Sequence, residues 1–327
     1  MVWIRAVVLV ACAASLMSCS RGEVRGDGSK ARAPWDALVN RRSALVQARS
    51  GFKTKLREVK EHREPVDSPP PELLRLVSYP TAIGPMRAYV SPPPGDGRRY
   101  PIMIWRFGGL SNGIGDLVWK PAPEVNDQSA SQYMREGLLM MYPSVRGAHD
   151  NPGHPEGFLG EVDDMRAAIA YARSLPYVDP EHVYLGGHST GATLALLTAA
   201  TLPAGVVRQV IALGPTDDIS GYGQDIMPFD MTDEAERRLR SPVRWLADVR
   251  TETLIVEGER GNADSARALE AVNNPLVSVS IVDNADHFLY VGPVNRVLAI
   301  GIRDEAAGKT PPNADDRTME QFEALTR

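Results

Sequence analysis

Cysteine is nearly absent from this chain of 327 residues, which contains only Cys12 and Cys19. Both lie near the amino terminus, so the rest of the chain has no thiol for a disulfide, a thiolate metal site or a cysteine nucleophile. The formal charge is −5, and no dense run of Lys or Arg exists that could follow a phosphate backbone. We therefore expect no disulfide framework, no thiol chemistry and no nucleic-acid partner.

Long apolar runs are also lacking, apart from Ala6 to Met17, which follows Arg5 and is too short to cross a bilayer comfortably. This pattern predicts a signal peptide over residues 1–18. Its end, Leu16-Met17-Ser18-Cys19, resembles the lipobox of bacterial lipoproteins, which implies that Cys19 carries lipid such as palmitate. The chain would then be anchored to a membrane of the cell envelope, outer or inner, with its folded part periplasmic or surface-exposed. A plain secretory signal and an uncleaved amino-terminal anchor are the alternatives.

The remaining chain divides by composition into four parts. Residues 19–33 are rich in Gly, Arg and Ser and predict a flexible tether. Residues 34–71 predict an amphipathic helix, over about 34–61, and a Pro-rich spacer that ends in Pro69-Pro70-Pro71. Residues 72–308 form the predicted catalytic domain, and residues 309–327 a carboxy-terminal tail.

Within residues 72–308, strand-like and helix-like segments alternate, which predicts an α/β fold with a mostly parallel sheet covered by helices on both faces. The first two predicted strands form an antiparallel pair, and the others are buried. The predicted strands are Leu73–Tyr79, Met86–Ser91, Pro101–Phe107, Gly137–Tyr142, His182–Gly186, Val207–Leu213, Thr253–Glu257 and Val277–Val282. Helical patterns occupy residues 129–136, 160–174, 190–202, 262–272 and 291–306.

One of the strand-to-helix junctions carries the pattern GxSxG, as Gly187-His188-Ser189-Thr190-Gly191. The pattern alone is weak, because Gly and Ser are common. Here a strand runs directly into it and a helix-forming stretch follows, which is the setting of a nucleophile elbow. Ser189 is therefore the predicted nucleophile, while the alternative is a turn whose serine only caps the helix.

These residues resemble the α/β-hydrolase superfamily, and within it the branch similar to prolyl oligopeptidase and dienelactone hydrolase. The closest stretch runs from Gly160-Glu161-Val162-Asp163-Asp164 through Leu175 to Pro180 and on to the elbow. The resemblance covers about residues 73–306 and implies the α/β-hydrolase fold with a serine nucleophile. Residues 20–60 have no counterpart in it.

A serine alcohol needs an imidazole to take its proton and a carboxylate to orient that imidazole. In the α/β-hydrolase fold the order along the chain is Ser, acid, His, with the histidine after the last strand. His287 has this position and is the predicted general base. The other histidines fit less well, and His188 is only the variable residue of the elbow.

The predicted acid is Asp264, in the loop after the strand Thr253–Glu257 and just before a helix that it could instead cap. Glu259 in the same loop is the second candidate. Asp217 and Asp218, after the preceding strand, come third. The pair Asp163 and Asp164 lies on a helix before the elbow and is expected to form ion pairs.

Two backbone N–H groups should stabilise the oxyanion. One is predicted at Thr190. The other is predicted at Gly109, with Leu110 next, because Phe107-Gly108-Gly109-Leu110 resembles the His-Gly-Gly turn of esterases with Phe in place of His. Residues from about 216 to 241 predict a small cap, in which Tyr222, Met227 and Phe229, with Trp245 beyond it, either line the pocket or pack in the core.

The sequence thus predicts a serine hydrolase that cleaves an ester or amide bond of a small molecule or short peptide through an acyl-enzyme, without cofactor or metal. Two rival hypotheses are an oligopeptidase-like peptidase and a lipid-anchored binding protein whose catalytic site has decayed.

Overall fold

The computed structural model describes residues 33–57, 63–109 and 111–309. The predicted signal peptide, the lipidation site Cys19, nearly all of the predicted tether and residues 310–327 lie outside these ranges. None of the helices in the described ranges is both long enough and apolar enough to span a bilayer.

Eight strands form one sheet in the order β1-β2-β4-β3-β5-β6-β7-β8. β1 pairs antiparallel with β2 and β2 antiparallel with β4, whereas all other neighbours are parallel. The strands are β1 Arg75–Thr81, β2 Gly84–Val90, β3 Tyr100–Arg106, β4 Leu139–Pro143, β5 Val178–His188, β6 Gln209–Leu213, β7 Thr253–Gly258 and β8 Val277–Val282. Each overlaps a predicted strand, and the predicted fold class is confirmed.

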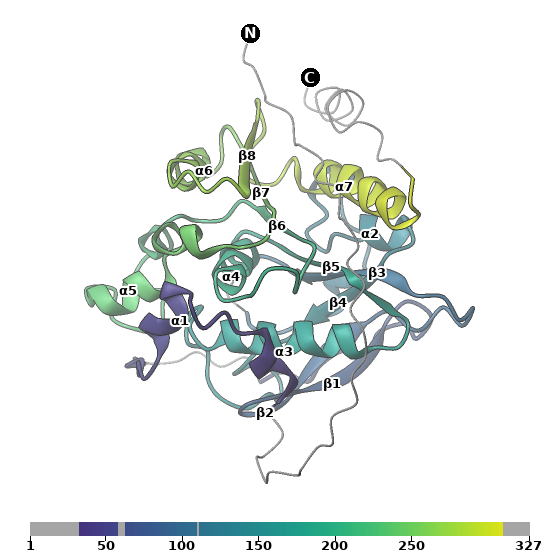
Figure 1. Cartoon of the computed structure of the whole chain (residues 1–327), viewed down its shortest axis with the longest axis horizontal. Helices are drawn as coiled ribbons and strands as arrows, with labels where there is room; N and C mark the ends of the chain where they lie inside the picture. Colours follow the sequence, from purple (N-terminus) through teal and green to yellow (C-terminus); the bar gives the residue numbers. More distant parts are fainter. Residues whose placement is uncertain (1–32, 58–62, 110, 310–327) are drawn as a thin grey trace, which may run out of the picture.

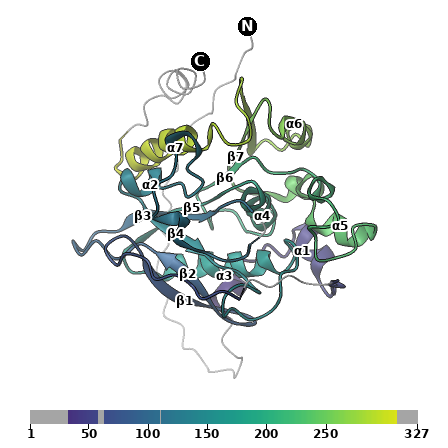
Figure 2. The same cartoon turned by 180° about the vertical axis from the view of Figure 1, so that it is seen from behind.

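Helices cover both faces of the sheet, as Figures 1 and 2 show from opposite sides. α3, α4 and α6 contribute to one hydrophobic cluster, while α7 and the short α2 contribute to a second cluster on the other face. Burial of both faces explains why the central strands read as continuous apolar runs. The helices are α1 Ala44–Arg49, α2 Gln132–Arg135, α3 Glu161–Ser174, α4 Thr190–Ala199, α5 Glu234–Arg240, α6 Ala263–Glu270 and α7 Val291–Ala306.

The single amphipathic helix predicted over residues 34–61 is wrong. The described part of this segment holds a 3-10 helix, η1 (Pro34–Leu38), and the six-residue α1, which ends just before Gly51 with a φ of +75°. Beyond it the described chain is not helical and satisfies part of its backbone through tertiary bonds: Lys55 N–H donates to Glu236 Oε1 at 2.8 Å and Arg57 N–H to the Pro228 carbonyl at 2.6 Å. Partners in the catalytic domain therefore override the weak helical periodicity.

The segment between β6 and β7 contains η4 (Ile219–Tyr222) and α5 in the region predicted as a cap. Met227, Phe229 and Trp245 are buried in the larger hydrophobic cluster, so these three are core contacts. Tyr222 is half-buried and stacks on Phe158, with ring centroids 5.7 Å apart. A role of this segment in covering the site stays a prediction.

Candidate active site

Ser189 lies in the sharp turn that joins β5 to α4, with φ +55° and ψ −119°. A side chain with a Cβ atom avoids positive φ, and such strain costs about 1–3 kcal/mol. The turn is held in place because Ser189 N–H donates to the Leu213 carbonyl at 2.7 Å, at the end of β6, and the Ser189 carbonyl accepts from Thr193 N–H at 3.0 Å. The local geometry is that of a nucleophile elbow.

Close approach of the strand, the helix and β3 requires the two glycines of the motif. A Cβ atom added to Gly187 would lie 2.5 Å from the backbone carbon of Gly191, and one added to Gly191 would lie 2.1 Å from the Arg106 carbonyl oxygen. Neither position has room for a side chain. The spacing GxSxG is therefore a packing requirement of this turn.

His287 lies in the loop between β8 and α7, as predicted, and its ring packs against the carboxyl end of β6. A Cβ atom added to Gly214 would lie 2.5 Å from Cε1 of His287. Since Ser189 is bonded to Leu213, the residue before Gly214, the serine and the imidazole both lie at this end of β6. The carboxyl ends of parallel strands are where α/β sheets place their ligand sites.

Glu257, the penultimate residue of β7, is the carboxylate that contacts the imidazole. Its Oε2 lies 3.0 Å from Nδ1 of His287, and its side chain is fully buried. Oε1 accepts the N–H of Gly258 at 2.7 Å, which orients the carboxylate. An ionised carboxylate can only accept a hydrogen bond, so the proton of the neutral imidazole lies on Nδ1 and Nε2 of His287 can accept a proton.

The predicted acid Asp264 is not near the histidine, and the expected pairing is wrong. Asp264 is the second residue of α6, its side chain is fully exposed, and it forms an ion pair with Arg267 at 3.0 Å. The loop after β7 turns this side chain to the surface of the molecule. Asp264 is therefore a solvated residue of the first helical turn.

The other predicted acids have different partners. Glu259 Oε2 accepts the N–H of Asn284 at 3.1 Å, Asp217 Oδ1 accepts from Ser265 Oγ at 2.7 Å, and Asp218 accepts the N–H of Ser220 as the cap of η4. Each of these carboxylates is thus committed to a turn or a cap.

Glu257 belongs to the predicted strand and not to the loop after it, yet the sequence contains a signal for its role. The apolar strand Thr253–Glu257 ends in a carboxylate, and a Glu at a fully buried position needs a specific partner. The extra methylene of Glu, compared with Asp, lets it reach the histidine from within the strand.

The two predicted oxyanion donors are neighbours. Thr190 is the first residue of α4, where helical N–H groups have no partner within the helix, and its hydroxyl donates to the Gly109 carbonyl. Gly109 is exposed, with φ +93°. Leu110, the alternative donor, lies outside the described residues, and the oxyanion role stays a prediction.

Arg106, at the end of β3, fixes the turn that contains Gly109. Its guanidinium donates to the carbonyls of Gly113 at 3.2 Å, Pro143 at 2.8 Å and Ser111 at 3.0 Å. Burial lowers the pKa of Arg106 to about 10, so the group remains charged at neutral pH. A buried cation that binds three carbonyls holds this loop in one geometry.

Asp163 and Asp164 form ion pairs, as expected from the sequence. Asp164 is buried and binds Arg146 at 2.8 Å, whereas Asp163 binds Arg49 at 2.9 Å and also pairs with Arg166. The pairs tie α3 both to the loop after β4 and to α1.

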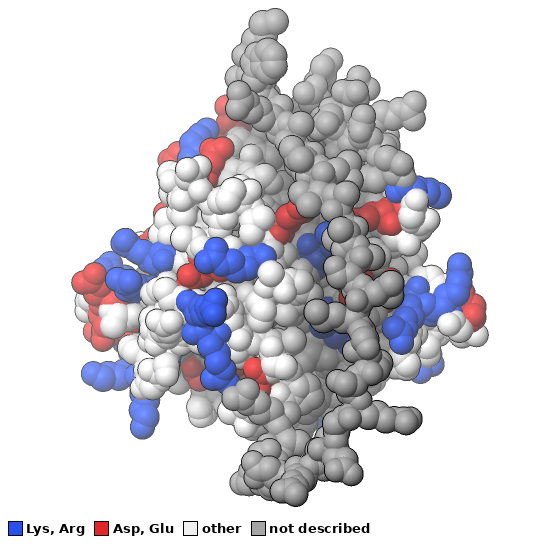
Figure 3. All heavy atoms as spheres, in the orientation of Figure 1, with Lys and Arg blue, Asp and Glu red and all other residues white. Residues whose placement is uncertain are grey.

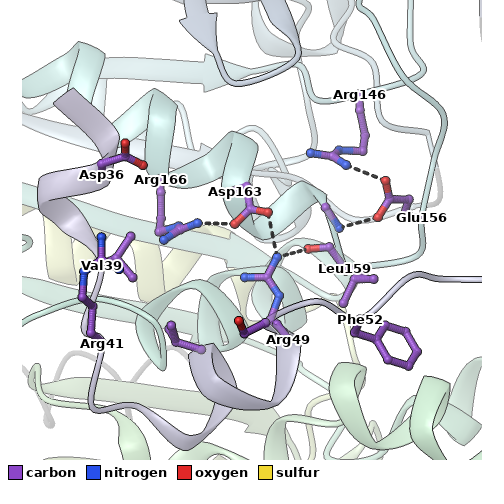
Figure 4. A pocket seen from close by; sticks show the side chains of 13 residues that line it. Asp36, Val39, Arg41, Arg49, Phe52, Arg146, Glu156, Leu159, Asp163 and Arg166 are labelled. Atoms are coloured by element: carbon purple, nitrogen blue, oxygen red, sulfur yellow. Dashed lines mark hydrogen bonds and ion pairs between the residues drawn. The ribbon is translucent and has the colours of Figure 1, made fainter. Parts of the chain in front are cut away.

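A charged cavity of about 360 Å³ lies between the amino-terminal segment and α3 (Figure 4). Arg49 and Arg166 point toward Asp163 in its wall, and Arg146 binds Glu156 nearby at 2.5 Å. Neither Ser189, His287 nor Glu257 lines it. The cavity is therefore separate from the candidate active site. Among the described residues no group of three His, Cys, Asp or Glu side chains is arranged to hold a metal ion.

The sheet order and the elbow define an α/β-hydrolase fold. The chain resembles dipeptidyl peptidase 4 of Porphyromonas gingivalis, with a TM-score of 0.52 and 20% identity over 65% of this chain and 32% of that one. It also resembles the acylaminoacyl peptidase of Pyrococcus horikoshii, with a TM-score of 0.56 and 14% identity over 76% of this chain and 44% of that one. A third similar structure is 2,6-dihydroxy-pseudo-oxynicotine hydrolase, with a TM-score of 0.54 and 17% identity over 73% of this chain and 70% of that one.

At the level of sequence, no protein-family model matches the chain. A segment of 74 residues is 38% identical to the quorum-quenching protein AidA of Acinetobacter baumannii (strain MDR-ZJ06). This segment is 22% of the present chain and 24% of that protein. The chain thus spans only part of the length of this relative and of the two peptidases.

Proposed function

We propose that this protein is a serine hydrolase that cleaves a carboxylic ester or amide bond, with Ser189 as nucleophile, His287 as general base and Glu257 as the acid. The observation that carries the proposal is the 3.0 Å contact between the buried Glu257 and His287 beside the strained elbow. Burial of an ionised carboxylate is costly unless it binds a partner, and here the partner is an imidazole. The hydrolases and peptidases of similar fold support the same reaction class.

Catalysis then follows from the positions of these groups. Nε2 of His287 takes the hydroxyl proton as Ser189 Oγ attacks the carbonyl carbon, and Glu257 stabilises the resulting imidazolium. The N–H groups of Thr190 and Gly109 bind the oxyanion. His287 returns its proton to the leaving alcohol or amine, and water, activated in the same way, releases the acid and regenerates Ser189.

The test is a comparison of wild type with Ser189→Ala. We expect the wild type to hydrolyse a p-nitrophenyl short-chain ester and to react with a fluorophosphonate probe at Ser189, and the variant to do neither while its circular dichroism is unchanged. Turnover by Ser189→Ala would exclude this nucleophile. A folded wild type without an adduct would favour the rival hypothesis of a binding protein.

The proposed site could release either an alcohol from an ester or an amine from a peptide. A matched panel of esters and blocked peptides with one acyl group separates an esterase from a peptidase by kcat/KM. The partial likeness to a quorum-quenching protein adds quorum-sensing signals that contain an ester or amide bond to this panel. Ester hydrolysis is the activity that we expect to be fastest, because an alkoxide leaves more readily than an amide nitrogen.

For the amino terminus we propose a lipid anchor at Cys19, and the positive charge of the first part of the folded chain supports this proposal. Residues 36–57 contain six Lys and Arg against one Asp, although the whole chain carries −5. In Figure 3, basic side chains gather over the surface where Figure 1 places α1. The exposed cations of this segment are Arg41, Arg42, Lys53, Lys55 and Arg57. Such a surface favours anionic headgroups next to an anchor.

Metabolic labelling with an alkyne fatty acid tests the anchor. Label and membrane association are expected in wild type and in Cys12→Ala, and are expected to be lost in Cys19→Ala. Equal labelling of Cys19→Ala would refute lipidation at this residue.

A further inference from the structure

His188 is fully buried directly beside the nucleophile, at the end of β5. It occupies the variable position of GxSxG before the serine, so the motif itself does not indicate a function for this side chain. A fully buried histidine must satisfy its ring nitrogens within the protein. The partners of this ring therefore show what it does.

One ring nitrogen of His188 binds the catalytic loop. Nε2 lies 3.0 Å from the carbonyl oxygen of His287. Because a carbonyl oxygen only accepts, Nε2 carries the proton and donates it. The residue before the nucleophile is thereby bonded to the main chain of the predicted general base, across 99 residues of sequence.

The ring of His188 also packs against the side chains of the same loop. Its centroid lies 4.7 Å from that of the His287 ring and 5.6 Å from that of Phe288. Phe288 in turn meets the His287 ring edge-on at 5.0 Å. Glu257 orients the His287 ring through Nδ1, whereas His188 and Phe288 confine it through van der Waals contact.

His188 touches the turn of the predicted oxyanion site as well. A Cβ atom added to Gly108 would lie 3.3 Å from Nδ1 of His188 and 3.0 Å from Cβ of Ser189. Within the described structure Nδ1 has no hydrogen-bond partner. The fold thus leaves one buried acceptor unsatisfied while it keeps the bond from Nε2 to the His287 loop.

The charge state of the ring suits this position. Burial, and the neighbouring His287 imidazole, lower the pKa of His188 to about 4, although its contact with the His287 carbonyl and the Glu257 carboxylate oppose the shift. His188 is neutral when the enzyme works near pH 7. A positive charge at this distance would oppose the imidazolium that forms on His287 during attack.

We propose that His188 is a positioning residue, which fixes the His287 loop relative to Ser189 through the hydrogen bond from its Nε2 to the His287 carbonyl. The proposal rests on the proposed function, because it assigns His188 to the same reaction. Loss of the bond lets the loop shift, and misplacement of a base by about 1 Å costs on the order of 10²-fold in rate.

The experiment compares substitutions of His188 that keep a hydrogen-bond donor with substitutions that remove it. Loss of a different histidine serves as the control. His188→Gln keeps an N–H donor at nearly the position of Nε2, whereas His188→Leu and His188→Met keep bulk but cannot donate. His182→Leu removes a histidine near the middle of the same strand, where Nδ1 lies 2.8 Å from Asp179 Oδ2. Kinetics on one p-nitrophenyl ester and thermal melting are measured for all four variants.

We expect His188→Leu and His188→Met to lower kcat by roughly 10- to 100-fold with KM within about twofold. His188→Gln is expected to retain kcat within about threefold, as is His182→Leu. A pure packing role predicts instead that Gln and the apolar variants lose activity together, and that result, like full activity of the apolar variants, would overturn the proposal. If Leu does not fold, the comparison of Met with Gln decides.

Failure of this inference is distinct from failure of the proposed function. Turnover by Ser189→Ala would refute both the proposed function and the role of His188. Inactivity of Ser189→Ala together with full activity of His188→Leu and His188→Met removes only the role of His188.

Discussion

The buried carboxylate of Glu257 shows how the burial of one side chain decides which acid contacts His287. It lies at the end of an apolar strand, where an unpaired charge would cost several kcal/mol. Its two oxygens have different partners: Oε1 accepts the N–H of Gly258, and Oε2 contacts the imidazole of His287. Asp264, seven residues further along the chain, is exposed and pairs with Arg267 instead.

Replacement of Glu257 by Gln tests this assignment. Glu257→Gln keeps the shape of the side chain but removes the charge that stabilises the imidazolium and can impose the wrong imidazole tautomer. We expect kcat to fall by about 10²- to 10⁴-fold while the circular dichroism spectrum is unchanged.

Asp264→Asn is the matched control for Glu257→Gln, and its kcat is expected to equal that of wild type. The opposite order of the two kcat values would restore Asp264 as the acid.

The low pKa of His188 predicts a pH dependence of stability. The unfolded chain binds a proton to this ring below its ordinary pKa of 6.5, while the folded protein does so only below about 4. The unfolded state therefore holds more protons between these values, and the free energy of unfolding decreases as the pH falls from about 6.5 to about 4. The contribution is at most about 3 kcal/mol.

Urea denaturation of wild type and His188→Gln at pH 7 and at pH 4.5 measures the effect. The decrease in unfolding free energy is expected to be smaller in the variant, and contributions of other groups cancel in the difference. An equal decrease in both proteins would show that His188 is not held neutral by the fold.

At the scale of elements, the junction of β5 with α4 depends on contact between backbones. The helix starts so close to β3 that the Arg106 carbonyl occupies the space of a side chain at Gly191. The same crossing brings the first N–H groups of α4 to the turn after β3. The packing of these elements and the position of the predicted oxyanion donors therefore depend on the same backbone contact.

A methyl group at Gly191 is expected to disturb both the packing of α4 on β3 and the position of the predicted oxyanion donors. We predict that Gly191→Ala destabilises the protein by about 3 kcal/mol and lowers kcat, because β3 and α4 must move apart. Thermal melting and ester kinetics measure the two effects.

Gly301→Ala provides the control for Gly191→Ala. Gly301 lies in α7 with nothing within 4 Å of an added Cβ atom, so this change is expected to stabilise the protein by about 0.5–1 kcal/mol. Equal melting temperatures of the two variants would contradict the close approach at the elbow.

At the scale of the whole molecule, the amino-terminal segment is part of the folded domain. Leu45 of α1 is fully buried in the larger hydrophobic cluster. The carboxylate of Asp248, just before β7, accepts from Ser43 Oγ at 3.0 Å and from Leu45 N–H at 2.9 Å. Residues that are 203 and 205 positions apart in sequence therefore stabilise one another.

Leu45→Ala is expected to lower the free energy of unfolding by about 2–5 kcal/mol, because it leaves a cavity in the core. The value of kcat at 25 °C is expected to stay within about twofold, since α1 contains none of the three proposed catalytic residues. Denaturant unfolding, together with ester kinetics, measures both.

Ala48→Gln, at an exposed position of α1, is expected to change the unfolding free energy by no more than about 0.5 kcal/mol. A Leu45→Ala variant as stable as Ala48→Gln would mean that the segment does not dock.

The sequence by itself determined the eight strands, the elbow around Ser189 and the place of His287, because hydrophobic periodicity, glycine spacing and order along the chain are local properties. It predicted one helix where α1 is followed by non-helical chain, because N–H groups of that chain donate to Glu236 and Pro228, which are distant in sequence.

Only the tertiary structure decided which carboxylate meets His287, since the choice between Glu257 and Asp264 depends on which side chain is buried at the sheet and which faces water. Only the tertiary structure gave His188 a partner, because the hydrogen bond joins the end of β5 to a loop 99 residues away, and neither segment shows by itself that the other lies beside it.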